Sequence, residues 1–589
     1  AGLAKIETLK PMIEVRDMCA VDKCHAYDRT WTCPPGCGTI EECAERMKQY
    51  DWGILLQTTA ELEDSLDYEG MQEGQERQKE HCMAFLKELR KVYKDILPLC
   101  SAGCDICKTC TYPDAPCRFP GRLLFLVGSD VVFSSILFLF RFLPIVLLIY
   151  YLCPFRLKNA VILIASLIFY AWGEPRFILL MFASILADYC AGLGIEFCRE
   201  RGVRWGTRAF LGLSLVFNLG SLGFFKYAGF FLDNLRALGF AAPVFSVALP
   251  LGISFYTFQT MSYSIDVYRG AVKAERNLLN FATFVCLFPQ LIAGPIVKYS
   301  DINEELHRRR ITSEDLEQGA RIFLLGLGSK VLLANQIGQL WDEMAMIGYE
   351  RLSMPLAWLG ILAYALQIYF DFSGYSLMAI GLGRLLGFKF PENFRFPYAS
   401  RSITEFWRRW HITLGSWFRE YLYIPLGGNR KGKYRTIFNL FVVWAATGFW
   451  HGASWNFVLW GLFFFVFLVL EKSFLLPFLE KHRIFSHCYL SILILISWVL
   501  FAVTDFSSIG VYFSRMFSFQ FSDDILYYLR NYGLILVLAI FFAVPACKRI
   551  GARLGKYPVL RFAGMAAILL FSTAYLVDAT YNPFLYFRF

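Results

Sequence analysis

Long apolar runs recur along the chain from residue 133 to residue 578, and short polar or basic stretches separate them. A helix that crosses a bilayer needs roughly 20 mostly apolar residues. The pattern predicts helices at 133–152, 158–172, 176–195, 208–231, 247–264, 280–297, 319–339, 355–383, 436–449, 454–477, 488–504, 533–547 and 560–578. We expect most of them to span a membrane and the short ones, such as 436–449, to be tilted, re-entrant or interfacial.

Residues before about position 120 follow a different pattern. They contain no long apolar run, most of the acidic stretches, and Cys19, Cys24, Cys33, Cys37, Cys43, Cys82, Cys100, Cys104, Cys107, Cys110 and Cys117. The whole chain of 589 residues is 56% hydrophobic and 17% aromatic, which excludes an ordinary soluble protein. We therefore predict an all-α polytopic membrane domain at 132–589, a junction at 121–131, and a small cysteine-rich domain at 1–120.

The cysteines form two clusters, 19–43 and 100–117. The order Cys104-x2-Cys107-x2-Cys110, with Cys117 and Pro120 behind it, resembles the thiolate spacing that holds an iron–sulfur cluster in bacterial ferredoxins. Zinc is the alternative metal, and a disulfide-stapled module is the third possibility. Residues 1–17 are charged and mixed, without the basic and then apolar pattern of a secretory signal peptide, which disfavours disulfides.

Two further strings support metal binding by residues 1–120. These are Cys33-Pro34-Pro35-Gly36-Cys37 and Cys117-Arg118-Phe119-Pro120. With them the segment resembles a family of uncharacterised cysteine-rich proteins that are predicted to bind metal.

Basic residues between apolar segments indicate the cytoplasmic side. Such residues gather at 199–208, 430–435 and 548–556. Counting from these loops places both the cysteine-rich domain and the C-terminus on the exoplasmic side, where a thiol-rich metal domain is not expected. Either the first apolar segment does not span, or the two domains are not naturally one polypeptide.

Two histidines lie within strongly apolar stretches, His411 in the run 406–414 and His451 between Trp450 and Gly452. Ionisable groups at bilayer depth usually face a cavity and serve a substrate or a proton path. Trp407, Trp410 and His411 have the i, i+3, i+4 spacing of one helical face, so we expect them to line that cavity. A neutral imidazole there can take the proton of a hydroxyl as it attacks a thioester; alternatively, His411 only bonds a backbone carbonyl.

Four segments carry a family resemblance: 250–259 (PLGISFYTFQ), 288–295 (FPQLIAGP), 370–375 (FDFSGY) and 406–433. Together they resemble the membrane-bound O-acyltransferase family, most closely its alginate O-acetyltransferase branch, from about residue 132 to the end. The resemblance implies helices around a tunnel, with a thioester donor such as acetyl-CoA entering from the cytoplasm and a polysaccharide acceptor outside. It also implies that His451 is catalytic and His411 is the second important histidine.

The resemblance bears on partners and on a carboxylate as well. Extracytoplasmic acetyl-transfer proteins are expected to act on the polysaccharide. Asp371 is the carboxylate of the segment 370–375, and either a catalytic role or a hydrogen bond to a neighbouring helix is open for it.

The C-terminal string Phe584-Leu585-Tyr586-Phe587 resembles the Phe-x-Tyr-Phe ending of the small partner peptide in D-alanyl transfer to teichoic acid. Tyr586 is therefore a candidate acyl relay, since a phenol can act as a nucleophile once a base takes its proton. An aromatic belt at the membrane interface explains the same residues.

Basic residues beside Gly427 and Gly428 are candidate ligands for the phosphates of the donor: Arg430, Lys431, Lys433 and Arg435. Ordinary orientation signals explain the same charges. The net charge of +10 suits contact with anionic lipids, and no nucleic-acid partner is expected.

Two other classes of protein compete with an acyltransferase. A transporter would often show inverted repeats, and no internal repeat is evident. A redox-coupled membrane protein would use the N-terminal metal centre, but the apolar part has no evident haem or quinone signature. We therefore expect a multi-pass acyltransferase of the cell membrane.

Overall fold

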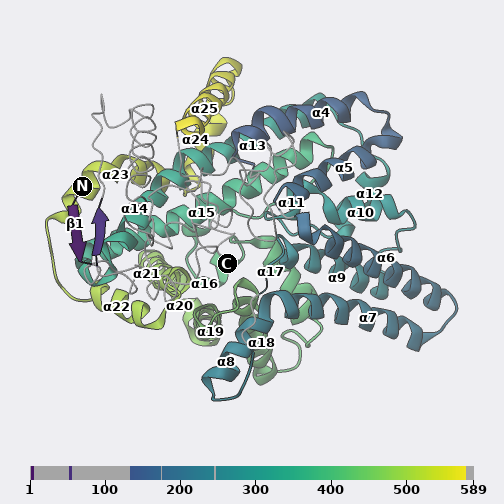
Figure 1. The fold of residues 1–589 in the computed structure, drawn as a ribbon, viewed down its shortest axis with the longest axis horizontal. Coiled ribbons are helices and arrows are strands. Elements are labelled where there is room, and N and C mark those ends of the chain that lie inside the picture. The colour runs from purple at the N-terminus through teal and green to yellow at the C-terminus, as the bar shows by residue number, and fades with distance from the viewer. Residues whose placement is uncertain are drawn as a thin grey trace. The chain divides into compact units, whose positions relative to one another are not determined.

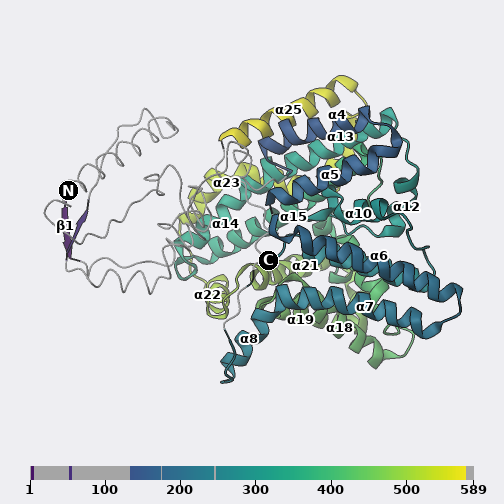
Figure 2. The same ribbon diagram turned by 45° about the vertical axis from the view of Figure 1, so that its right-hand side comes forward.

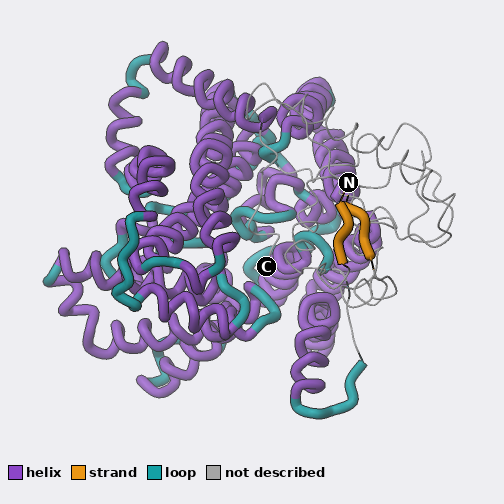
Figure 3. The backbone as a smooth tube through the Cα atoms, turned by 60° about the vertical axis from the view of Figure 1, so that its left-hand side comes forward, coloured by secondary structure: helices purple, strands orange, loops and turns teal. Residues whose placement is uncertain are grey.

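The computed structural model describes residues 2–5, 52–55, 133–173, 175–243, 247 and 249–578. The chain forms two compact units, Ala1–Ser129 and Asp130–Phe589. In the first unit, the described residues form strands β1 (Gly2–Lys5) and β2 (Trp52–Leu55), which pair antiparallel with Gly2 opposite Leu55. The described elements of the second unit are all helical (Figure 3).

The α-helices of the second unit fall into two halves along the chain. The first half consists of α4 (Leu143–Leu152), α5 (Phe155–Gly173), α6 (Ile178–Glu200), α7 (Arg204–Leu222), α8 (Ala228–Ala237), α9 (Ile253–Arg269), α10 (Leu278–Cys286), α11 (Phe288–Leu291), α12 (Tyr299–His307), α13 (Ser313–Gly328) and α14 (Asn335–Ile347). The second half consists of α15 (Met354–Leu385), α16 (Ile403–Trp407), α17 (Ile412–Phe418), α18 (Lys433–His451), α19 (Trp455–Leu470), α20 (Leu476–Lys481), α21 (Arg483–Ala502), α22 (Phe506–Met516), α23 (Asp524–Phe542), α24 (Ala546–Leu554) and α25 (Pro558–Asp578).

Short segments of different winding join or extend these helices. The π-helical ones are η3 (Phe138–Phe142), η5 (Gly223–Tyr227), η6 (Ser329–Ala334), η9 (Arg419–Tyr423) and η10 (Glu471–Leu475). The 3-10 segments are η4 (Pro175–Phe177), η7 (Tyr349–Arg351) and η8 (Pro397–Ala399).

Within the described residues, nine helices are long and apolar enough to cross a membrane. They are Phe155–Trp172, Pro175–Glu200, Arg204–Ala237, Ser313–Ile347, Met354–Leu385, Trp455–Lys481, Arg483–Ala502, Asp524–Phe542 and Pro558–Val577. The prediction of an all-α polytopic membrane protein is confirmed.

The prediction of one helix over 280–297 is wrong. The chain there forms α10, turns at Leu287 and forms the single turn α11, after which it runs without helix to Lys298. Pro289 and Pro295 explain the break, because proline has no amide hydrogen and clashes with the preceding turn. The segment is apolar because it is buried inside the protein, with Phe288 fully covered.

The long helix α15 is the central element, and it lies along α13 in both ribbon views (Figures 1 and 2). Glycines allow this close approach: a Cβ at Gly326 would lie 2.5 Å from the carbonyl oxygen of Gly374. Just beyond Gly326, the π-helical segment η6 presents Lys330, whose Nζ lies 2.6 Å from Oδ1 of Asp371 on α15. Both side chains of this ion pair are buried.

Helices α18 and α19 form a hairpin that depends on glycine in the same way. A Cβ at Gly461 would lie 2.3 Å from the carbonyl oxygen of Trp444, and one at Gly448 would lie 2.3 Å from that of Phe457. The two backbones therefore touch where α18 approaches its end. This contact fixes the direction in which α18 delivers its last residue, His451.

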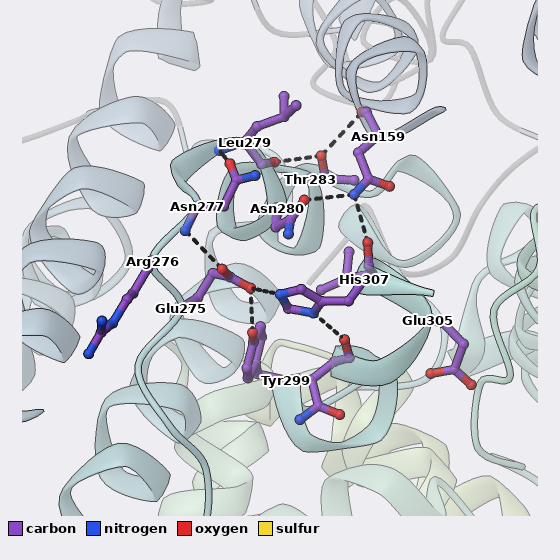
Figure 4. A network of polar contacts seen from close by, with 12 residues as sticks. Asn159, Glu275, Arg276, Asn277, Leu279, Asn280, Thr283, Tyr299, Glu305 and His307 are labelled. Atoms are coloured by element: carbon purple, nitrogen blue, oxygen red, sulfur yellow. Dashed lines mark hydrogen bonds and ion pairs between the residues drawn. The ribbon is translucent and has the colours of Figure 1, made fainter. Parts of the chain in front are cut away.

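A polar network holds the irregular chain around α12 in place (Figure 4). The buried carboxylate of Glu275 accepts a hydrogen bond from the hydroxyl of Tyr299 (2.7 Å) and lies 3.1 Å from Nε2 of His307. Asn159 on α5 donates to Oδ1 of Asn280 on α10 at 2.7 Å. Because buried polar groups are costly unless paired, this network fixes the ends of α10 and α12 and the connection between them.

Candidate functional site

His451 is the last residue of α18, and its side chain is buried. The chain then turns into an extended Gly452, where a Cβ would lie 2.3 Å from the ring of Phe457. Aromatic rings surround the imidazole: the ring centroids of Trp450 and Trp460 lie 5.0 Å away, and that of Phe501 lies 5.4 Å away. Its Nε2 has no hydrogen-bond partner among the described residues.

His411 lies between two short helices, which corrects the prediction that Trp407, Trp410 and His411 share one helical face. Helix α16 ends at Trp407, and α17 begins at Ile412. His411 between them has a left-handed backbone with φ of 43°. This conformation is uncommon for a residue other than glycine and costs roughly 1–3 kcal/mol, so the surrounding structure must hold it.

Asn393 is the residue that holds His411. Its backbone carbonyl accepts from the amide of Ile412 at 2.9 Å, and its side-chain Oδ1 lies 3.0 Å from Nδ1 of His411. The same Oδ1 accepts from the hydroxyl of Thr413 at 2.9 Å, while Nδ2 donates to the hydroxyl of Ser376 at 3.1 Å and to the carbonyl of Gly294 at 3.3 Å.

These partners assign the proton on His411. An amide oxygen can only accept, so Nδ1 of the imidazole must carry the hydrogen. In the neutral ring Nε2 is then an acceptor, and it is buried without a partner among the described residues. Both histidines thus present an Nε2 that no described side chain satisfies, which is unusual in a protein interior and typical of a site that receives a ligand.

The indole of Trp450 connects the two histidines. Its ring centroid lies 5.0 Å from that of His451 and 6.2 Å from that of His411. On the other side it packs against Phe258, which stacks on Trp417 at 3.8 Å. The two imidazoles therefore border one aromatic-walled region between α9, α17 and the end of α18.

Trp407 and Trp410 are packing residues of the wall behind this region. Trp407 contacts Trp444 and Trp460 at 4.7 and 5.6 Å between centroids, and Trp410 contacts Trp498 at 5.1 Å. Trp460 is the common neighbour, because it touches both Trp407 and His451.

The remaining predicted residues lie in different places. Asp371 pairs with Lys330, as described above. The side chains of the basic residues of the 430–435 segment are exposed: Arg430, Lys431, Lys433 and Arg435. Tyr586 lies outside the described residues, and so do the eleven cysteines of the N-terminal region. No group of three or more potential metal ligands occurs in the part of the chain that the structure describes.

Sequence reasoning missed three residues that build the site. Asn393 orients His411, Lys226 contacts the backbone of His451, and Glu471 accepts hydrogen bonds from the amides of Ile403 (2.6 Å) and Thr404 (2.8 Å) at the start of α16. For Lys226 and Glu471 a signal existed, since each is a charged residue within an apolar run. Asn393 carries no such signal.

Replacing Asn393 by leucine is expected to lower the free energy of unfolding by roughly 1–3 kcal/mol for each buried donor left without an acceptor. Turnover should fall as well, because His411 loses the bond that fixes its proton on Nδ1. Thermal unfolding in detergent and turnover per folded molecule measure the two effects. Asn159→Leu is the control, since it removes another buried amide far from the histidines along the chain and should lower stability alone. Equal turnover in both variants would show that the orientation of His411 is unimportant.

Comparisons with known proteins match the chain to two families. The model of the "MBOAT, membrane-bound O-acyltransferase family" matches residues 269–515, and that of the "Predicted metal-binding protein (DUF2284)" family matches residues 4–127. The chain is 43% identical over 399 residues to a "Probable alginate O-acetylase AlgI" of Azotobacter vinelandii, which covers 66% of this chain and 78% of the relative.

More distant relatives carry related activities in their names. A "Peptidoglycan O-acetyltransferase" of Helicobacter pylori is 36% identical over 380 residues, covering 58% of this chain and 71% of the relative. A "Teichoic acid D-alanyltransferase" of Streptococcus thermophilus is 33% identical over 246 residues, covering 38% of this chain and 57% of the relative. Both family resemblances recognised in the sequence are confirmed. The chain belongs to the membrane-bound O-acyltransferase family, and it is a multi-pass membrane O-acyltransferase.

Proposed function

We propose that this enzyme transfers an acetyl group from a cytoplasmic thioester toward a hydroxyl of an exported or cell-surface polysaccharide, with His451 as the general base. The observation that carries the proposal is the buried, unpartnered Nε2 of His451 beside a second imidazole of the same kind. The names of the relatives support the acceptor class, since they act on alginate, peptidoglycan and teichoic acid.

The proposed reaction balances with groups that the site supplies. The acceptor hydroxyl attacks the thioester carbonyl carbon while Nε2 of His451 takes its proton. A C–O bond forms, the C–S bond breaks, and the thiolate that leaves takes the proton back from the imidazolium. His411, whose Nδ1–H is held by Asn393, offers Nε2 as a fixed acceptor for a neighbouring hydroxyl of the polysaccharide, which orients the acceptor. Aromatic walls around both rings exclude water, which would otherwise hydrolyse the thioester.

The exposed basic residues 430–435 are proposed to bind the phosphates of the donor. They follow Gly427 and Gly428, both with positive φ, in a tight loop that Asn439 holds by donating to the carbonyl of Gly428 at 2.8 Å. By the charge rule this loop faces the cytoplasm, where coenzyme A thioesters are available.

Changing Arg430, Lys431, Lys433 and Arg435 together to glutamine is expected to raise KM for acetyl-CoA roughly tenfold or more, because each charge-assisted hydrogen bond contributes about 1.5–3 kcal/mol. Acetyl-pantetheine, which has no phosphate, is the matched donor and should be turned over equally by both proteins. Thiol release from the full chain in detergent measures both. An equal rise of KM for the two donors would contradict phosphate recognition by this loop.

Four further roles remain proposals. Residues 1–120 are proposed to form a separate domain that binds an iron–sulfur cluster or zinc through the cysteines named above, and the family match over 4–127 supports metal binding without choosing the metal. Tyr586 is proposed as an acyl relay on the exoplasmic side. Separate extracytoplasmic acetyl-transfer proteins are proposed to complete the modification of the polysaccharide, and anionic lipids to contact the basic loops.

A further inference from the structure

Lys226 is a charged residue in the middle of a long apolar helix, at the point where its winding changes. Helices α7 and α8 form one continuous membrane segment, Arg204–Ala237, and η5 (Gly223–Tyr227) is a π-helical bulge within it. Such bulges insert an extra residue, re-aim the side chains around them and occur frequently at functional sites. Here the bulge directs Lys226 and Tyr227 at the end of α18.

The two side chains cap the helix that carries His451. Nζ of Lys226 donates to the carbonyl of Trp450 at 2.6 Å and lies 3.4 Å from that of His451. The hydroxyl of Tyr227 donates to the carbonyl of Phe449 at 2.9 Å, and its ring stacks on that of Phe449 at 4.1 Å. The last carbonyls of a helix have no donor within it, so these contacts satisfy three in succession.

Acceptor atoms surround Nζ of Lys226. Its neighbours are two carbonyl oxygens and the hydroxyl of Ser254 at 3.4 Å, so each of its three hydrogens has an acceptor. The face of the Trp450 indole lies 5.8 Å away, within range of a cation–π contact. The C-terminal end of α18 also carries partial negative charge, which favours a cation there.

A positive charge at this place acts on the nearby imidazole. Burial is the first cause that lowers the pKa of His451, and the charges of His411, at the start of α17, and of Lys226, on η5, act in the same direction. A cation close to an imidazole disfavours its protonation, because the imidazolium would repel it. A general base must be unprotonated before it can work, so the charge of Lys226 keeps the ring competent at lower pH.

We propose that Lys226 is a positioning residue of the acyl-transfer site, which fixes His451 by capping α18 and by its charge keeps the imidazole neutral. This inference rests on the proposed role of His451 as the base. It assigns one function to the bulge η5, to the placement of a lysine within an apolar helix, and to the contacts at the end of α18.

The test compares five variants of the full chain in detergent, His451→Ala among them, with thiol release from acetyl-CoA followed from acidic to neutral pH. Lys226→Gln keeps a hydrogen-bond donor and removes the charge. It should lower kcat with little change in KM and move the acidic fall of activity upward by about one pH unit. Lys226→Arg retains the charge and should leave the acidic fall where it is.

Two further variants separate charge from capping. Tyr227→Phe weakens the cap without changing any charge, and it should lower the unfolding temperature without moving the pH profile. Lys158→Gln is the matched lysine control, since Lys158 also lies over an aromatic ring, that of Tyr150, at 4.5 Å. Lys158→Gln should change neither the unfolding temperature nor the pH profile.

The outcomes distinguish this inference from the proposed function. The unfolding temperature shows whether Lys226→Gln is folded. If His451→Ala abolishes turnover while folded Lys226→Gln keeps the pH profile of the unchanged protein, the proposed role of Lys226 is wrong and that of His451 stands. If His451→Ala remains active, the base assignment is wrong and the inference fails with it. A shift of the acidic fall in Lys226→Gln, absent in Tyr227→Phe, supports the inference.

Discussion

Replacing His451 by alanine is expected to lower thioester turnover by roughly 10²–10⁴-fold, the usual contribution of a general base. The physical reason is that Nε2 of His451 is buried and has no competing partner among the described residues, so it is available to the acceptor hydroxyl. The measurement is release of free thiol from acetyl-CoA by the full chain in detergent, with and without an oligosaccharide acceptor.

His487→Ala is the matched control, because His487 lies on α21 with an exposed side chain. This variant should keep the turnover of the unchanged protein. The unfolding temperature of His451→Ala must also be measured, since removing a ring packed against Trp460 and Phe501 leaves a cavity. Turnover near that of the unchanged protein in folded His451→Ala would exclude this residue as the base.

A smaller loss of turnover in His411→Ala than in His451→Ala would separate the roles of the two histidines. If His411 binds a neighbouring hydroxyl of the acceptor while His451 takes the proton of the attacking hydroxyl, His411→Ala loses positioning and His451→Ala loses the chemical step. The acceptor-dependent part of the thiol release should then fall more than the acceptor-independent part in His411→Ala. Equal losses in both variants would mean that the imidazoles act as one unit.

The sequence identified the family and pointed to both histidines as candidates, because their motifs are local strings. His451 could be read from Trp450-His451-Gly452 alone. The geometry around His411 could not be read in the same way. Its spacing from Trp407 fits a helix, but tertiary hydrogen bonds from Asn393 hold the backbone of His411 in a left-handed conformation that ends the helix. No periodicity encodes a partner that lies on a separate loop.

One helix prediction failed because a run of apolar residues can be buried inside the protein instead of lying in the membrane. Residues 280–297 are as apolar as a membrane span, yet they are buried inside the protein and broken at Leu287. Hydrophobicity measures exclusion from water, and it does not distinguish lipid from a protein interior. The two prolines at 289 and 295 were the local signal that favoured the correct alternative.

Removing Asp371 alone is expected to lower the free energy of unfolding by about 3–5 kcal/mol, because Asp371→Leu leaves the ammonium of Lys330 buried without its carboxylate. The pair is 2.6 Å apart, with each side chain about 2–3% exposed. The double variant Lys330→Met and Asp371→Leu removes both charges and should recover most of that stability, since a buried ion pair can often be replaced by apolar side chains of similar size. Unfolding temperature in detergent measures both effects.

The double variant also decides whether Asp371 takes part in catalysis. Lys330 lies on η6 and Asp371 on α15, so the pair joins the two helical elements at the centre of the membrane domain. If this is its whole role, the folded double variant should turn over acetyl-CoA at close to the rate of the unchanged protein. If the double variant is folded and inactive, Asp371 or Lys330 acts in the reaction.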